Sequence, residues 1–356
     1  MRLMFLTGSR GEWGYIRPVI MEAQKRGHEC NVVATNMHLS KAHGSTWKEL
    51  DVGDIHLVEM DKHHSRDSHA SALGNLLASF NDLLPHYKPN WLILAGDRGE
   101  QLMGAIAGAY SYIPTAHIQA GEISGNIDNA ARMAMAKLCH MHLASTEQCV
   151  QRLISMGEEP WRCQHTGAPQ LDEMVSYTPK RPMEEPFYLV VMHPTTDEVE
   201  DAEKQFLALK AACDKLPHRK VWIAPNNDPG WREIYKHLPD GVISNMPRQQ
   251  YLDHLRYCKC LIGNSSSGIL EAPTYGTLAV NVGNRQLGRE RGDNVFDVPT
   301  WDPEAIVQAV RDANEWKWKT RVIDNPYGDG KSSPRIVDVL EKYHKDVNLT
   351  TKRQTY

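Results

Sequence analysis

The sequence predicts an α/β protein built of two Rossmann-like domains, and two observations carry that prediction. Short apolar runs of strand length alternate with helical patterns, and these runs lead into polar loops. The alternation stops at residues 177–186, where three prolines stand among charged residues, and then starts again. A length of 356 residues is also long for one domain and comfortable for two. We therefore expect a first domain at residues 1–176, a linker at 177–186 and a second domain from residue 187.

The first strand, residues 2–6, leads into the loop Thr-Gly-Ser-Arg-Gly-Glu-Trp-Gly at 7–14, which precedes a helix at 15–26 and a strand at 30–34. This order is the opening of a doubly wound parallel sheet. In such sheets ligands bind at the carboxyl ends of the strands, which is where this loop lies. Arg10 could therefore reach a diphosphate, the alternative being an ordinary surface charge.

Two further strands of the first half, at 91–95 and 113–118, also end in polar loops. The charged residues that follow these strands are Asp97, Arg98, Glu122 and Asp128. Glu122 and Asp128 could face one cleft. Asp97 is either the N-cap of the following helix or an acid/base group.

The predicted strands of the second half are also followed by polar residues. These strands are expected at 187–192, before His193; at 221–224, before Asn227; at 242–243; and at 278–282, before Arg285. Arg285 is the first of three arginines within seven residues, a pattern that suits phosphate or carboxylate capture. The alternative for this segment is a charged surface loop.

One stretch of the second half has the pattern of a phosphate-binding loop. A strand ending at Ile262 is followed by a tight loop that contains Ser265 and Ser266, and then by a helix expected from Ile269, with Glu271 in its first turn. Backbone N–H groups and hydroxyls at a helix start favour negative charge. The alternative is a serine-rich helix cap. If the two halves face each other, these loops line a cleft between two domains, suited to a phosphorylated small molecule.

Composition excludes several classes of protein. Apolar residues make up 41% and charged residues 24%, and a net charge of −4 gives no electrostatic reason for nucleic-acid binding. Seven scattered cysteines without a CxxC pair predict reduced thiols in a cytoplasmic protein. No signal peptide or membrane span is expected. Three histidines at 61–69 could bind a metal, but their spacing is irregular and a solvated loop is the favoured interpretation.

Eight motifs spread over nearly the whole chain resemble those of one known family. They are TGSRGEWG (7–14), GDRGE (96–100), HIQAGEISGNIDNAAR (117–132), HP (193–194), PNND (225–228), GNSSSGILEAP (263–273), NRQLGRERGDNV (284–295) and NPYGDGKSS (325–333). The family is the hydrolysing UDP-N-acetylglucosamine 2-epimerases of sialic and legionaminic acid biosynthesis. The resemblance implies the GT-B-like arrangement of nucleotide-sugar glycosyltransferases, with a second domain at 187–332. It also implies that segment 333–356 holds a helix crossing back onto the first domain.

The resemblance implies a reaction and a set of site residues. UDP would be eliminated across C1 and C2 of UDP-N-acetylglucosamine to give a 2-acetamidoglucal, and water would add to give N-acetylmannosamine. The catalytic group would be Asp97, Glu122, Asp128 and His193, without an assignment of base and acid. The substrate would be bound by Arg10, Arg98, Asn227, Ser265, Ser266, Glu271 and Arg285. No cofactor or metal is implied, and the family implies a homodimer or homotetramer.

Three residues depart from the family pattern and leave alternatives open. Gln119 stands where relatives carry Glu or His, Asn129 replaces a second acid, and Met133 replaces His. Amides cannot act as carboxylates in proton transfer. The same reaction on a UDP- or GDP-linked 2,4-diacetamido-2,4,6-trideoxy sugar therefore remains open. So do a glycosyltransferase of similar architecture and a binding protein that has lost the chemistry.

Overall fold

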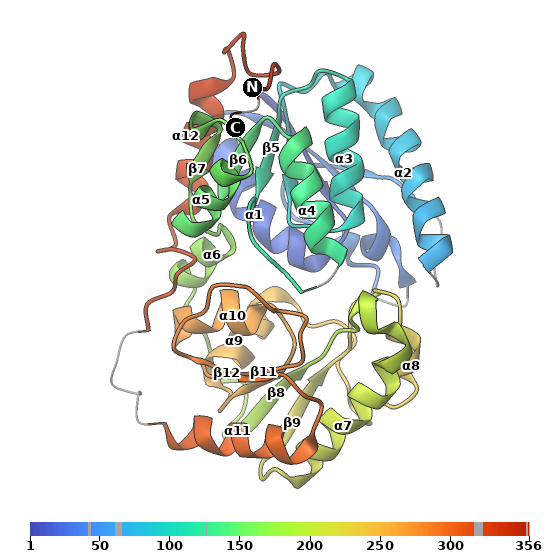
Figure 1. Ribbon diagram of the computed structural model, residues 1–356, viewed down its shortest axis with the longest axis vertical. Coiled ribbons are helices and arrows are strands. Elements are labelled where there is room, and N and C mark those ends of the chain that lie inside the picture. The colour runs from blue at the N-terminus through green and yellow to red at the C-terminus, as the bar shows by residue number, and fades with distance from the viewer. Residues whose placement is uncertain (42–43, 61–65, 126, 317–322, 354, 356) are drawn as a thin grey trace. The chain divides into compact units, whose positions relative to one another are not determined.

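The computed structural model describes residues 1–41, 44–60, 66–125, 127–316, 323–353 and 355, and it contains two compact α/β units (Figure 1). Unit 1 comprises Met1–Glu122, Asp128–Glu173 and Tyr327–Tyr356, and unit 2 comprises Ile123–Ile127 and Met174–Pro326. Each unit is a parallel sheet with helices packed on it. The predicted class of two Rossmann-like domains is confirmed.

Unit 1 is built on a seven-stranded parallel sheet of described residues in the order β3-β2-β1-β4-β5-β6-β7. The strands are β1 (Arg2–Thr7), β2 (Glu29–Ala34), β3 (Asp54–Leu57), β4 (Trp91–Ala95), β5 (Thr115–Ile118), β6 (Met141–Ala144) and β7 (Cys163–His165). The helices are α1 (Arg10–Lys25), α2 (Arg66–Tyr87), α3 (Gly99–Tyr110), α4 (Ile127–Leu138), α5 (Glu147–Ser155), α6 (Gln170–Ser176) and α12 (Ser332–Tyr343). Among the described residues of this unit, 3₁₀ turns lie at Asn36–Leu39, Thr46–Glu49 and Pro160–Arg162. The strand order reverses between β1 and β4, and ligands bind at such a switch point in open α/β sheets.

Helix α1 begins five residues earlier than the sequence predicts. Ser9 is its N-cap and accepts the backbone N–H of Glu12 at 3.4 Å. The Glu12 side chain reaches back to the N–H of Gly8, so the pair resembles a capping box. Arg10 is consequently the first residue of the helix rather than part of an open loop.

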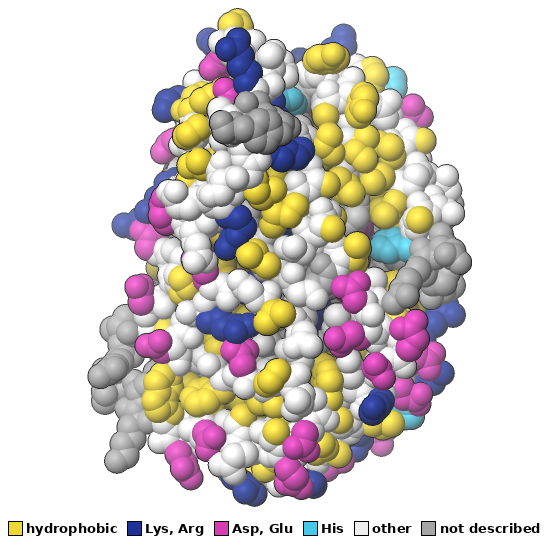
Figure 2. Space-filling view, viewed as in Figure 1, with side chains coloured by type: hydrophobic (Ala, Val, Ile, Leu, Met, Phe, Trp, Pro, Cys, Tyr) yellow, Lys and Arg dark blue, Asp and Glu magenta, His cyan; other side chains and the backbone are white. Residues whose placement is uncertain are grey.

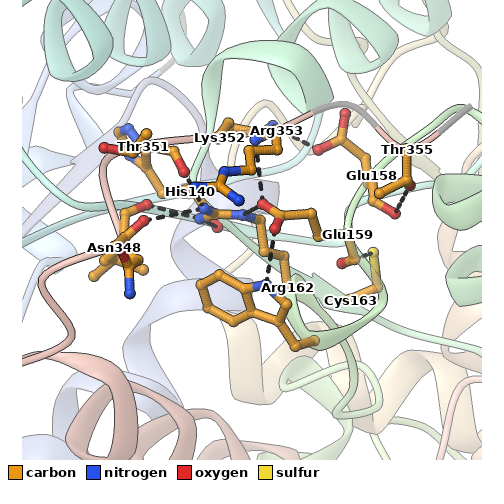
Figure 3. A network of polar contacts seen from close by, with 12 residues as sticks. His140, Glu158, Glu159, Arg162, Cys163, Asn348, Thr351, Lys352, Arg353 and Thr355 are labelled. Carbon is orange, nitrogen blue, oxygen red and sulfur yellow. Dashed lines mark hydrogen bonds and ion pairs between the residues drawn. The ribbon is translucent and has the colours of Figure 1, made fainter.

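The C-terminal segment packs on unit 1 (Figure 3). The indole N–H of Trp91 in β4 donates to the carbonyl of Leu340 in α12 at 3.2 Å. The fully buried Arg162 donates to four carbonyl groups at 2.7–3.2 Å, those of His140, Asn348, Leu349 and Thr351. A buried charge needs such partners, so Arg162 ties the last residues to the β6–β7 edge of the sheet.

Unit 2 is built on a five-stranded parallel sheet of described residues in the order β12-β11-β10-β8-β9. Its strands are β8 (Phe187–Val191), β9 (Arg219–Ile223), β10 (Leu261–Gly263), β11 (Ala279–Val282) and β12 (Val295–Val298). Its helices are α7 (Ala202–Lys215), α8 (Trp231–Tyr235), α9 (Arg248–Tyr257), α10 (Ser267–Leu270) and α11 (Pro303–Glu315), with 3₁₀ turns at Thr196–Asp201 and Ala272–Tyr275. The switch point of this sheet lies between β8 and β10.

Two expected elements of unit 2 differ in the structure. The strand predicted at 242–243 is a single parallel bridge between Ile243 and Ile223. The helix predicted from Ile269 begins at Ser267 and has only four residues, followed by a 3₁₀ turn that contains Pro273. Proline has no N–H to donate and clashes with the preceding turn, so the helix cannot continue. A four-residue helix has only a small dipole, so the dipole of α10 contributes little to binding a phosphate at this loop.

Figure 2 shows hydrophobic side chains gathered over α3 and α4 on the displayed face of unit 1. The most exposed aromatic side chains of this unit lie at the end of α3, where Tyr110 is 82% and Tyr112 is 78% exposed. Among the described residues, no helix has both the length and the apolar character to cross a membrane. Most of the histidine-containing stretch at 61–69 lies outside the described residues.

Candidate functional site

The predicted residues of unit 1 gather at the carboxyl ends of its central strands. Arg10 begins α1 after β1. Asp97 and Arg98 follow β4, and Arg98 is the N-terminal flanking residue of α3. Glu122 follows β5, and Asp128 lies in the first turn of α4. Since β1, β4 and β5 are neighbours in the sheet, these side chains share one edge at the switch point.

Arg132, which was not among the predicted site residues, connects two of the predicted carboxylates. Its side chain is 1% exposed and forms an ion pair with Asp97. The other terminal nitrogen, Nη1, donates to the carbonyl of Gln119 at 2.6 Å and lies 4.0 Å from Oε2 of Glu122. A buried guanidinium must be compensated by negative partners. Arg132 therefore holds Asp97 and Glu122 around one positive charge.

Glu122 has a second partner that fixes its orientation. The carboxylate is 2% exposed, and its Oε1 accepts the hydroxyl of Ser145 at 2.7 Å. Asp128 is half-buried and lies four positions before Arg132 on α4, which places the two on one face of the helix. Asp97 and Glu122 thus lie beside the same arginine, and Asp128 lies on the helix face that carries it.

Gln119 has an unusual backbone at the end of β5. Its φ is +62°, a value that few residues other than glycine adopt, and the residue is 1% exposed. Its N–H donates to the carbonyl of Leu143 at 3.0 Å, while its own carbonyl accepts from Arg132. Strained backbone of this kind collects at functional sites. Asn129 and Met133, the other two departures, lie half-buried on α4.

His117 supports the loop that carries Asp97. Its Nε2 lies 2.7 Å from the carbonyl oxygen of Gly96. Burial lowers the pKa of His117 to about 3, so the imidazole is neutral and its Nε2–H donates to that carbonyl. His117 is fully buried and therefore acts on the site through the loop rather than on a ligand.

In unit 2, Asn264 connects the ends of β8 and β10. Its Oδ1 accepts the N–H of His193 at 2.7 Å, and its Nδ2 donates to the carbonyl of His193 at 2.8 Å. The preceding residue, Gly263, has φ of +134°, and a Cβ there would lie 2.0 Å from the carbonyl oxygen of Val191. Only glycine permits this approach of the two strands. The loop after β10 is therefore tied directly to the predicted catalytic histidine.

His193 is held in one tautomer. The backbone N–H of Asn226 donates to its Nδ1 at 3.1 Å. Because Nδ1 accepts this bond, the proton of the neutral imidazole is on Nε2. His193 is half-buried, and it therefore presents an N–H donor at the switch point of the sheet.

Arg285 lies beside the same loop. Its Nη1 donates to the carbonyl of Asn264 at 3.4 Å, and its Nη2 lies 3.8 Å from Asp228. Its Nε has no hydrogen-bond partner in the part of the chain that the structure describes. Since an arginine has five N–H donors in a planar fork, this side chain retains donors for an anion.

The remaining predicted binding residues of unit 2 are distributed around this loop. The hydroxyl of Ser265 lies 3.0 Å from that of Ser267, and Ser266 is half-buried next to it. Asn227 is 7% exposed in the loop after β9. Glu271, at the end of α10, forms an ion pair of 2.8 Å with Arg248 in α9. Hydroxyls, one arginine and one carboxylate at a switch point suit a diphosphate with an attached diol.

Four buried residues of these sites were missed from the sequence. They are Glu12, Glu100, Arg132 and Asn264. All four lie inside the motifs that carry the family resemblance, which is the signal that could have found them. All four side chains are buried, so none of them presents an exposed reactive group.

Comparison with known proteins assigns the chain to a family. The sequence profile described as UDP-N-acetylglucosamine 2-epimerase matches residues 21–341. The UDP-N,N'-diacetylbacillosamine 2-epimerase (hydrolyzing) of Legionella pneumophila is 34% identical, with 100% of this chain and 99% of that protein covered. The UDP-N-acetylglucosamine 2-epimerase of Neisseria meningitidis serogroup B is 31% identical, with 88% and 87% covered.

A solved structure shows the same fold. The S. aureus MnaA–UDP co-structure superposes with a TM-score of 0.81 at 18% identity, covering 100% of this chain and 99% of the other. The family profile, the full-length relatives and the doubly wound architecture agree with one another. The protein is therefore an enzyme of the UDP-N-acetylglucosamine 2-epimerase family.

Proposed function

We propose that the protein is a hydrolysing 2-epimerase that converts a UDP-linked 2-acetamido sugar into UDP and the free 2-epimer. The observation that carries the proposal is the 34% identity, over the whole chain, to a relative whose name gives a hydrolysing 2-epimerase. The carboxylates held around Arg132 in unit 1 support it, because elimination needs a base. The hydroxyls and arginine of unit 2 support it, because departing UDP needs donors.

In the first step, a carboxylate of unit 1 removes the proton from C2 of the sugar. The C1–O bond to UDP breaks, its electron pair leaves with the diphosphate, and a C1–C2 double bond forms. Asp97, Glu122 and Asp128 are the candidate bases and acids of this step. Arg132 compensates part of the negative charge of these carboxylates, since it pairs with Asp97 and lies 4.0 Å from Glu122.

Unit 2 binds the nucleotide in this proposal. Arg285, Ser265 and Ser266 receive the diphosphate, and Asn227 and His193 add donors near the bond that breaks. Glu271 binds the ribose hydroxyls, which requires it to share its carboxylate with Arg248. On the side of the sugar, Arg10 and Arg98 complete the binding set. Such donors stabilise the negative charge that develops on UDP as the C1–O bond breaks.

In the second step, water adds across the double bond. The oxygen of water bonds to C1 and a proton is delivered to C2 from the face opposite to its departure, so the configuration at C2 is inverted. The balance is one water consumed, with UDP and the 2-epimer released. With UDP-N-acetylglucosamine the product is N-acetylmannosamine.

A second substrate is favoured by a specific observation. The relative at 34% identity is named for UDP-N,N'-diacetylbacillosamine, whereas the relative at 31% is named for UDP-N-acetylglucosamine. The amide of Gln119 in place of an ionisable side chain also suits a changed sugar pocket. A protein serving legionaminic acid synthesis would use the first sugar, and one serving sialic acid synthesis would use the second.

Rates of UDP release with each sugar separate the two candidates. The preferred substrate should have a kcat/KM at least about tenfold higher, the discrimination that one buried polar contact provides. Equal values would mean that the pocket does not distinguish the substituents at C4 and C6. UDP release only in the presence of an added sugar acceptor would support a glycosyltransferase instead. UDP binding without release of product would support a binding protein.

The proposal includes the assembly and the location of the enzyme. We propose a homodimer or homotetramer, and the apolar surface over α3 and α4 supports a protein contact there (Figure 2). Light scattering on the purified protein measures the mass directly. The seven cysteines are free and buried, a state typical of cytoplasmic proteins, which supports a cytoplasmic location.

A further inference from the structure

Two buried glutamates lie beneath the switch point of unit 1 and take no part in the reaction proposed above. Glu12 in α1 is 2% exposed and Glu100 in α3 is 0% exposed. They lie in the first turns of α1 and α3, which follow β1 and β4, close in sequence to Arg10, Asp97 and Arg98. A buried carboxylate is costly unless it is paired or protonated. The pair therefore requires a physical account.

Gly8 separates the two side chains. Its N–H donates to Oε2 of Glu12 at 2.5 Å, and a Cβ built on it would lie 2.8 Å from Oε1 of Glu100. The hydrogen bond to Gly8 could be no more than a helix cap. A cap, however, is normally solvated, whereas Glu12 is sealed from water and faces a second carboxylate.

Glu100 is the member of the pair with polar partners. Its Oε1 accepts a hydrogen bond from Nδ2 of Asn36 and lies 3.5 Å from Nε of Arg98. By contrast, Oε1 of Glu12 and Oε2 of Glu100 have no hydrogen-bond partner in the described part of the chain. Glu100 is thus matched to a guanidinium and an amide, whereas Glu12 has the backbone N–H of Gly8 and the side-chain amide of Gln101 as its hydrogen-bond partners.

The surrounding charges decide which member is ionised. Burial first, and then the negative charge of Glu100, raise the pKa of Glu12 to about 8. Burial also acts against ionisation of Glu100, but Arg98 and Asn36 lower its pKa overall. His38 also faces the pair, but its burial lowers its own pKa to about 4, so it is neutral.

His69 in α2 also acts on Glu100, and Arg10 acts on His38. Arg98 is therefore the permanent positive charge next to the pair. Two carboxylates that share one site with one permanent cation retain one negative charge between them.

We propose that Glu12 and Glu100 are a pair of positioning residues that share one proton, so that a single negative charge, kept on Glu100, holds Arg98 in place beside Asp97. The proton on Glu12 prevents two like charges from separating the loops after β1 and β4. This inference rests on the proposed function for its effect on turnover. The protonation of the pair is independent of that function and can be measured in the absence of any substrate.

The first test measures unfolding free energy against pH for the wild type and for Glu12→Gln. Between pH 4.5 and about 8 the unfolded chain releases the Glu12 proton while the folded chain keeps it, so this group makes the wild type less stable as the pH rises. Glutamine mimics the protonated acid and cannot titrate. The variant should therefore gain stability relative to the wild type from pH 5 to pH 8.

A matched control removes a carboxylate from the solvent side of the same helix. Glu22 in α1 forms its contacts with Arg26 and Lys25 at the surface. Glu22→Gln should differ from the wild type by a constant amount over this pH range. A constant difference for Glu12→Gln as well would overturn the shared proton. It would mean that Glu12 is already ionised in the folded protein, so that unfolding releases no proton from it.

The second test measures turnover with the better of the two UDP-sugars. Glu100→Gln should lower kcat/KM by about ten- to a hundredfold, because Arg98 loses its negative partner. Glu12→Gln should lower it about threefold or less, and should remove an alkaline loss of activity near pH 8. Equal losses in the two variants with unchanged pH profiles would contradict the positioning role. If no UDP-sugar is turned over, the stability test still decides whether the proton is shared.

Discussion

The side chain of Asn264 forms two hydrogen bonds with the backbone of His193, at 2.7 Å and 2.8 Å. These bonds join the ends of β8 and β10, which are neighbours at the switch point of unit 2. The carbonyl of Asn264 also accepts from Arg285 and, at 3.0 Å, from Gln286. Asn264 therefore contacts a proposed catalytic residue, His193, through its side-chain amide, and a proposed diphosphate ligand, Arg285, through its backbone carbonyl.

Replacing Asn264 with Ala should lower both stability and turnover. Two backbone groups of His193 lose their partners, at a cost of about 1–3 kcal/mol in unfolding free energy. Turnover should fall at least about tenfold, because His193 is no longer held. Urea unfolding and UDP release measure the two effects. Asn314→Ala is the control, since its Nδ2 donates to Tyr188 in the same unit at 3.0 Å; equal turnover in both variants would argue against a positioning role for Asn264.

His193→Ala should abolish turnover without unfolding the protein. The imidazole is half-buried at the carboxyl end of β8 rather than part of the hydrophobic core, so its loss removes little packing. A general acid/base or a donor in the transition state contributes about 10²–10⁴ to the rate. Single-turnover kinetics and circular dichroism check the two parts. His237→Ala, which removes a surface histidine paired with Glu203, is the control. A rate within threefold of the wild type would remove His193 from the mechanism.

Asp97→Ala should lose stability as well as activity. Its carboxylate is the ion-pair partner of the fully buried Arg132, and breaking a buried pair costs about 3–5 kcal/mol. Asp97→Asn keeps an acceptor for Arg132 and should be more stable than Asp97→Ala while remaining inactive. Thermal unfolding and UDP release distinguish these outcomes. Activity in Asp97→Asn would show that the residue serves only to hold Arg132.

The double variant Ser265→Ala with Arg285→Ala should weaken UDP binding. Each charge-assisted hydrogen bond to the diphosphate is worth about 1.5–3 kcal/mol, so affinity should fall by a factor of ten or more. Calorimetry with UDP gives the dissociation constant directly. Arg311→Ala removes an exposed positive charge from α11 of the same unit and controls for net charge. Unchanged UDP affinity in the double variant would exclude this loop as the diphosphate site.

Acid should weaken the C-terminal anchor of unit 1, the buried ion pair of 2.6 Å between Glu158 and Lys352 that holds the last residues on the sheet. Burial opposes ionisation of Glu158, yet His142 and Lys352 lower its pKa overall to about 2. Stability from this carboxylate is present above its ordinary pKa of 4.5 and is lost as the pH falls towards 2. Burial lowers the pKa of His142 to about 4. The folded protein therefore also loses stability as the pH falls from 6.5 to 4, because the unfolded chain takes up this proton first.

Glu158→Gln tests this anchor. The variant should be about 3 kcal/mol less stable at pH 7, since Lys352 and Lys137 lose a buried partner. It should approach the stability of the wild type as the pH falls to 3. Urea unfolding at several pH values provides the comparison, and Glu184→Gln at an exposed position is the control. A difference that stays constant with pH would mean that Glu158 does not titrate with the anchor.

Much of the fold can be predicted because central strands are buried on both faces. Strand β4 has five buried residues out of five and reads as a continuous apolar run. Strands β3 and β12 lie at sheet edges and are largely exposed or half-buried, so no such run marks them. Helix α10 has only four residues, because Pro273 lies three residues after its end and does not allow the helix to continue.

The site is predictable in part for a related reason. Asp97, Glu122 and His193 stand directly after strands, and topology alone brings such residues to one sheet edge. The partners of Arg132 and Asn264, unlike the residues themselves, cannot be predicted from the motifs, because these partners depend on which strands are neighbours. The sharing of a proton between Glu12 and Glu100 likewise depends on burial, which a motif does not express.

Proton NMR in deuterated water, with UDP-N-acetylglucosamine and UDP-N,N'-diacetylbacillosamine in separate tubes, tests the central claim most directly. We expect that at least one of the two substrates gives UDP and a free sugar with inverted configuration and deuterium at C2, because the proton is exchanged in elimination and hydration. Release of a free sugar that keeps its C2 proton, or a 2-epimer still attached to UDP, would contradict a hydrolysing 2-epimerase.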